Sequence, residues 1–83
     1  MKNFRQHAIG YIASRMWEAT TSYNPFSQVV RDFRTVNERD GFEIEYIPQG
    51  LPGGNWLRIE GVRLTPEEME EAISRAKGLL EGN

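Results

Sequence analysis

The stretch that decides the fold runs from residue 42 to residue 64 and reads FEIEYIPQGLPGGNWLRIEGVRL. Apolar and acidic residues alternate from Phe42 to Tyr46, which is typical of a half-buried strand. Two more apolar segments, 55–59 and 62–64, are separated only by Glu60-Gly61, which predicts a two-residue hairpin. The sequence therefore predicts a three-stranded antiparallel sheet with strands over 42–47, 55–59 and 62–64.

This register gives the sheet one apolar face, which we expect to form the core. Its members are Phe42, Ile44, Tyr46, Leu57, Ile59, Val62 and Leu64. On the other face Arg58 stands opposite Arg63, and such a like-charge pair is unfavourable. Glu43 and Glu45 on the neighbouring strand are expected to compensate for it.

A helix is predicted before the sheet, over residues 2–19. Its apolar residues cover well over half of the circumference, and Arg15 interrupts the apolar arc. Either this helix lies between the sheet and a second helix, or its edge formed by Ala13, Met16 and Trp17 is a surface for self-association or a partner.

A second helix is predicted over 25–39. Asn24 is expected to cap it, Pro25 suits its first turn, and Asp40-Gly41 supplies a stop. Its apolar stripe consists of Phe26, Val29, Val30, Phe33 and Val36. Arg34 then lies on its solvated face.

The last helix is predicted over 66–80, because Thr65, Pro66 and Glu68 form a capping box with proline at the first helical position. The fold class is therefore α+β. We expect one small domain, residues 1–83, in the order α-α-β-β-β-α, with the three-stranded antiparallel sheet packed on the helices.

Composition narrows the possible classes of protein. The chain has 83 residues, no cysteine and a net charge of −2. A chain without cysteine offers no disulfide or thiolate metal site, and it suits a reducing compartment, so a cytoplasmic location is expected. No segment reads as a membrane span or a signal peptide. A domain of this size buries a small core, so a partner or a homodimer would stabilise it.

No catalytic set is expected, and neither a metal nor a cofactor. The chain has a single histidine, His7, with Ser14 two helical turns away. Seven residues of helix rise is about 10 Å, which is too far for a direct hydrogen bond. The sequence thus predicts a protein that is not an enzyme.

Residues 24–29, Asn-Pro-Phe-Ser-Gln-Val, resemble the opening of the first helix of the double-stranded-RNA-binding domain. The predicted order from there, helix, three strands and helix, is similar to that family. The resemblance implies phosphate-binding lysines at the start of the last helix. Here the chain has Glu67, Glu68, Glu70 and Glu71. Acidic side chains repel RNA, so nucleic acid is not the expected partner.

A protein-binding module is the function we expect. As a small, cysteine-free domain of nearly neutral charge, the chain resembles the small bacteriophage proteins that block a host machine, anti-CRISPR proteins among them. This resemblance implies inhibition by steric occlusion. The alternatives are a double-stranded-RNA-binding-like domain and a small structural dimer. The predicted partner-binding residues on the outward sheet face and its loop are Ile47, Leu51, Trp56, Arg58 and Arg63, although the loop 48–55 could instead only pack on the sheet.

Overall fold

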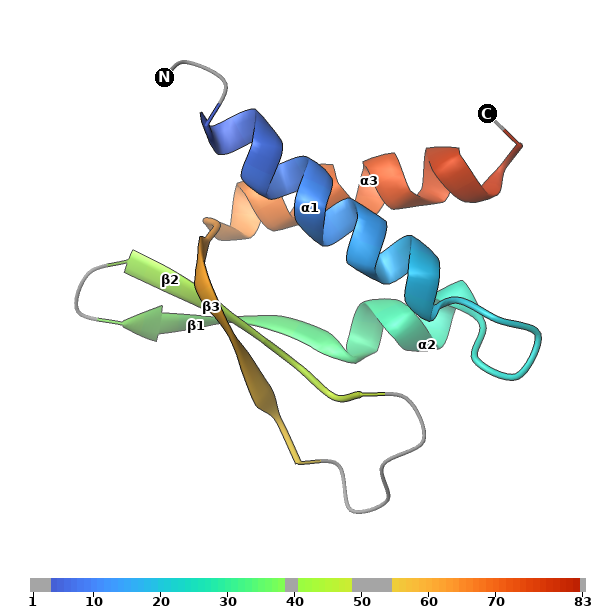
Figure 1. The fold of residues 1–83 in the computed structure, drawn as a ribbon, viewed down its shortest axis with the longest axis horizontal. Coiled ribbons are helices and arrows are strands. Elements are labelled where there is room, and N and C mark those ends of the chain that lie inside the picture. The colour runs from blue at the N-terminus through green and yellow to red at the C-terminus, as the bar shows by residue number, and fades with distance from the viewer. Residues whose placement is uncertain (1–3, 39–40, 49–54, 83) are drawn as a thin grey trace.

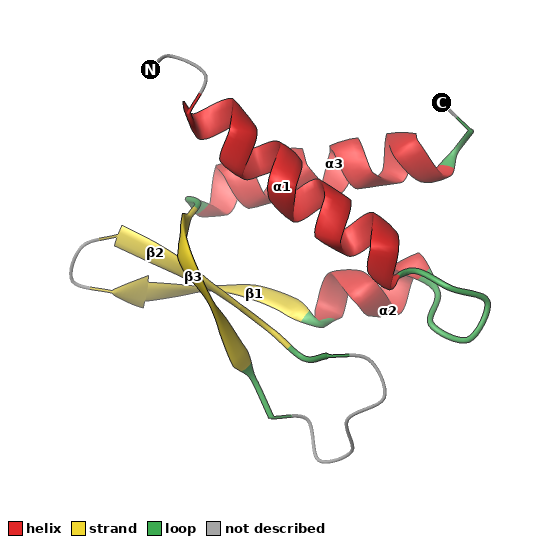
Figure 2. Cartoon of the chain, in the orientation of Figure 1, coloured by secondary structure: helices red, strands yellow, loops and turns green. Residues whose placement is uncertain are grey.

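The computed structural model describes residues 4–38, 41–48 and 55–82. It contains three helices and a three-stranded antiparallel sheet in the order α-α-β-β-β-α. The α+β fold class is therefore confirmed. Figures 1 and 2 show the two long helices crossing above the sheet and the short helix continuing into its first strand.

The two long helices pack against each other. α1 spans Phe4–Ala19, and residues 2 and 3 of the predicted helix lie outside the described part. α3 spans Pro66–Leu80 and begins with a capping box, in which the Glu68 N–H donates to Thr65 Oγ1 at 3.1 Å and the Thr65 N–H donates to Glu68 Oε1 at 3.0 Å. Arg5 of α1 also donates to Glu68, with Nε 2.8 Å from Oε2. None of the described helices is long and apolar enough to cross a membrane.

The prediction of a helix over 25–39 was wrong beyond its first two turns. α2 spans only Phe26–Arg31, and Phe33–Glu38 form a strand, β1. The segment that was assigned to helix contains the β-branched pair Thr35-Val36, which favours a strand once a partner strand is beside it. Asn24 does not cap α2 either, because its side-chain amide donates to the Ala19 carbonyl at the end of α1, at 3.2 Å.

The sheet has the order β1-β2-β3, with β2 over Gly41–Tyr46 and β3 over Leu57–Arg63. The predicted hairpin at Glu60-Gly61 is absent, because these two residues lie inside β3. Ile44 pairs with Ile59, whereas the residue before it in β2, Glu43, pairs with Arg63. One residue along β2 therefore corresponds to four residues along β3. The extra residues form a bulge in which Gly61 has a φ of +78°.

This bulge reverses the alternation of side chains along β3. Ile59 points to the core before it, and Arg63 pairs with Glu43 on the opposite face after it. Val62 and Leu64 therefore also pack on the core side. The predicted division of β3 between two faces is confirmed, although a bulge produces it and not a turn. Two members of the predicted apolar face are exceptions, since Leu57 is 44% exposed and Phe42 does not belong to the core cluster.

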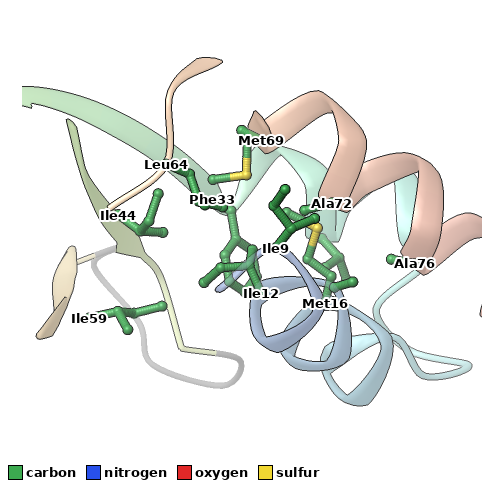
Figure 3. Close-up of a cluster of buried hydrophobic side chains, with 12 residues drawn as sticks. Ile9, Ile12, Met16, Phe33, Ile44, Ile59, Leu64, Met69, Ala72 and Ala76 are labelled. Atoms are coloured by element: carbon green, nitrogen blue, oxygen red, sulfur yellow. The ribbon is translucent and has the colours of Figure 1, made fainter. Parts of the chain in front are cut away.

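One hydrophobic core joins the helices to one face of the sheet. Figure 3 shows side chains of β1, β2 and β3 pointing toward α1 and α3. The buried members are Ile9, Ile12, Ala13, Met16, Val29, Phe33, Ile44, Ile59, Leu64, Met69, Ala72 and Ala76. The helices thus cover one face of the sheet, and the other is the natural place to look for a site.

Candidate functional site

The face of the sheet turned away from the helices carries a connected set of ion pairs. Arg34 of β1 lies 2.7 Å from the Glu45 carboxylate of β2, and Arg58 of β3 lies 3.3 Å from the same carboxylate. Arg58 also lies 3.2 Å from Glu43, and Arg63 lies 3.1 Å from it. Each strand contributes to this network, so its geometry follows from the register of the sheet.

The arginines are the outermost charges of this network. The side chains of Arg34, Arg58 and Arg63 are 48%, 39% and 42% exposed, whereas those of Glu43 and Glu45 are 14% and 15% exposed. The hydrogen bond from Arg34, supported by that from Arg58, holds the pKa of the Glu45 carboxyl below its ordinary value. The Glu45 carboxylate is therefore held ionised beneath the arginines, and the three guanidinium groups are the charges that a partner would contact first.

Trp56 extends this surface beyond the ion pairs. The Arg34 guanidinium lies 3.9 Å from the centre of the Trp56 ring, a cation–π contact. Arg34 is thus restrained from two sides, by an indole ring and by a carboxylate. We call the surface formed by Arg34, Glu43, Glu45, Trp56, Arg58 and Arg63 the arginine face.

The structure brings together three of the five predicted partner-binding residues. Arg58 and Arg63 share the Glu43 carboxylate, and Trp56 joins the same surface through Arg34. Ile47 instead lines a pocket beside α1 and α2. Leu51 lies outside the described residues.

Arg34 belongs to the arginine face although it was not among the predicted partner-binding residues. It was placed on the solvated side of a helix, whereas it belongs to β1 and pairs with Glu45. The signal that would have found it is the β-branched pair Thr35-Val36 directly after it, which favours a strand.

The predicted self-association edge of the first helix is not available as a surface. Ala13 and Met16 are 2% and 0% exposed and belong to the core. Their side chains face α3 and the sheet because they share one side of α1 with Ile9 and Ile12. Only Trp17 of that edge is accessible, with 47% of its surface exposed.

Two of the glutamates at the start of α3 have structural roles. Glu68 closes the capping box and binds Arg5, and that hydrogen bond holds the pKa of Glu68 below its ordinary value. Glu71 pairs with Arg75 one turn later, at 2.7 Å. Within residues 4–38, 41–48 and 55–82, no three His, Cys, Asp or Glu side chains form a group that could hold a metal ion.

Comparison with known proteins does not assign the chain to a family. No protein-family model, no curated protein and no solved structure matches it. A function must therefore be inferred from the chemistry of the surfaces described above.

Proposed function

We propose that this protein is a small non-catalytic domain that binds another protein through the arginine face. The observation that supports this is the set of three half-exposed arginines fixed by two glutamates, with Trp56 stacked on one of them. Tryptophan and arginine are the residues most enriched at binding hot spots. Ion pairs that fix their side chains before binding reduce the entropy that is lost on association.

The partner should present an acidic surface. Arginine forms bidentate hydrogen bonds with carboxylates, and the three guanidinium groups lie above the two acids that fix them. A domain of 83 residues bound to such a surface would also cover it. We therefore propose steric occlusion as the mode of action, the mode implied by the resemblance in size to bacteriophage inhibitors such as anti-CRISPR proteins.

Duplex RNA is a less suitable partner on electrostatic grounds. The order of α2, the three strands and α3 is the one that the resemblance to double-stranded-RNA-binding domains implies. However, the first two turns of α3 expose Glu67, Glu70 and Glu71 where that resemblance implies lysines. Their repulsion of phosphates disfavours RNA at the surface that the resemblance assigns to it.

Two double variants with the same chemistry test the proposal. Trp56→Ala with Arg58→Gln removes two residues of the arginine face, whereas Trp17→Ala with Arg31→Gln makes the same changes on α1 and α2, where both residues are exposed. Affinity capture from a bacterial lysate, read by mass spectrometry, identifies a partner of the wild-type protein, whose affinity for each variant is then measured.

The first variant should bind at least about tenfold more weakly, and the control should bind like the wild type. Circular dichroism confirms that both are folded, and duplex RNA is titrated in parallel. Equal affinities of both double variants for the partner would overturn the assignment of the site, and tighter binding of duplex RNA than of any captured protein would overturn the class of partner.

A further inference from the structure

A pocket of about 200 Å³ lies beside the C-terminal half of α1, where α2 leads into β1 and β2 ends. Phe33 and Tyr46 give it an apolar wall, and their rings stack with their centres 5.7 Å apart. Drug-sized ligands usually occupy roughly 300–1,000 Å³, so this pocket suits a smaller molecule. It lies apart from the arginine face, since none of the arginines of that face lines it.

Arg15 brings a positive charge into this pocket. Its guanidinium lies 4.9 Å from the centre of the Tyr46 ring and 5.7 Å from that of Tyr11, and its Nη1 donates to the Tyr11 hydroxyl at 2.9 Å. Burial lowers the pKa of Arg15, but its hydrogen bonds with the two tyrosines raise it further, so the side chain stays charged. Among the described residues, no carboxylate forms an ion pair with it. A guanidinium has five N–H donors, so a ligand carboxylate would supply acceptors that the tyrosines do not.

Glu18 and Asp32 line the same pocket without pairing with Arg15. Asp32 accepts a hydrogen bond from the Gln28 side-chain amide at 3.0 Å, and it lies where α2 leads into β1. The pocket thus offers a cation, two carboxylates and an apolar wall within a volume of about one amino acid. A purely anionic ligand would meet repulsion from both acids, and a purely cationic one would meet repulsion from Arg15.

We propose that this pocket binds a free α-amino acid with an apolar or aromatic side chain. Its carboxylate would bind Arg15, its ammonium group would bind Asp32 and Glu18, and its side chain would pack against Phe33 and Tyr46. This is a second site, which does not depend on the protein-binding role of the arginine face.

Three probes that differ in one charge each test the proposal on the wild-type protein. Phenylalanine carries both charges, N-acetylphenylalanine lacks the ammonium group and phenylalaninamide lacks the carboxylate. Each is titrated at constant pH and salt while the amide resonances of residues around the pocket are followed by NMR. Phenylalanine should shift resonances near Phe33 and Tyr46, and both blocked analogues should bind at least tenfold more weakly.

The variant Arg15→Gln should remove the preference for phenylalanine over phenylalaninamide, because the amide does not need the guanidinium. Arg31→Gln makes the same change in charge on the exposed side of α2 and should keep the preference. If Arg15→Gln does not fold, the comparison of the three probes on the wild type decides alone. Equal affinities for the three probes, or no shifts at millimolar phenylalanine, would overturn the proposal.

Discussion

The bulge in β3 makes a sharp prediction about Gly61. Its φ of +78° lies in the left-handed region, and a Cβ added there would meet no atom within 4 Å. Gly61→Ala therefore creates no clash with the rest of the molecule, and its cost comes only from the backbone conformation. A non-glycine residue in this region costs about 1–2 kcal/mol, and asparagine costs less. We expect Gly61→Ala to lower the free energy of unfolding by about that amount, and Gly61→Asn to lower it by less.

Gly78 in α3 provides the matched control. A Cβ at Gly78 would also meet no atom within 4 Å, but its backbone is helical, so Gly78→Ala should raise the free energy of unfolding by about 0.5–1 kcal/mol. Urea denaturation followed by circular dichroism measures both changes, and each kcal/mol should move the thermal midpoint by about 4–8 °C in a domain of this size. If Gly61→Ala is as stable as the wild type or more stable, β3 contains no left-handed bulge residue and this description of the strand is wrong.

Three further changes test the cap, the core and the helix contact. Thr65→Ala removes the acceptor of the Glu68 N–H and should cost about 1 kcal/mol in urea denaturation, whereas an unchanged midpoint would mean that α3 begins elsewhere. Ile44→Ala empties a fully buried site in the central strand and should cost roughly 2–5 kcal/mol, and a loss below about 1 kcal/mol would contradict its place in the core. The pKa of Glu68 is lowered in the folded state from an ordinary value of 4.5, so this carboxylate adds stability above about pH 4.5 that is lost as the pH falls through its folded pKa. Glu68→Gln should therefore flatten the loss of stability below pH 4.5, and an unchanged acid profile would exclude the pairing with Arg5.

Local alternation in the sequence predicted the two faces of the sheet because it reflects burial directly. Glu43 and Glu45 alternate with Ile44, so either all the acids or all the apolar residues of β2 must face the core. The expectation that these acids compensate Arg58 and Arg63 followed from the same periodicity. The structure confirms it through the ion pairs on the arginine face.

The hairpin was wrong because Glu60-Gly61 fits two local structures equally well. A two-residue turn and a bulge both use a glycine at positive φ, and both leave Val62 and Leu64 on the side of Ile59. What separates them is the pairing of Arg63 with Glu43 of β2, which keeps the chain beside β2 after Gly61 and joins residues that are far apart in the sequence.

The helix over 25–39 was wrong for a related reason. Val29, Phe33 and Val36 recur at helical spacing, yet Thr35 and Val36 are β-branched and favour a strand. In that strand Val36 pairs with Glu43, so it lies on the face away from the core and not in the predicted apolar stripe. Pairing with β2 favours the strand over the helix, because Glu45 of β2 pairs with Arg34. This contact joins two separate segments of the chain, so local sequence patterns do not reveal it. The dipeptide Asp40-Gly41, interpreted as a helix stop, is equally typical of a hairpin turn.

The pocket beside α1 gave almost no signal in the sequence. Its lining comes from α1, α2, β1 and β2, so only the tertiary fold brings its charges together. The one feature of the sequence that pointed to the pocket was Arg15, a charged residue within the apolar arc of the first helix.

If a partner binds as proposed, it buries the arginine face, and the two tryptophans allow this burial to be measured. Trp17→Phe leaves Trp56 as the reporter of the arginine face, and Trp56→Phe leaves Trp17 as the reporter of the exposed side of α1. Acrylamide quenching of each variant is measured with and without the captured partner. Binding should shield Trp56 from acrylamide and leave Trp17 as accessible as before. Quenching of Trp56 that is unchanged in the complex, with Trp17 shielded instead, would contradict the proposal.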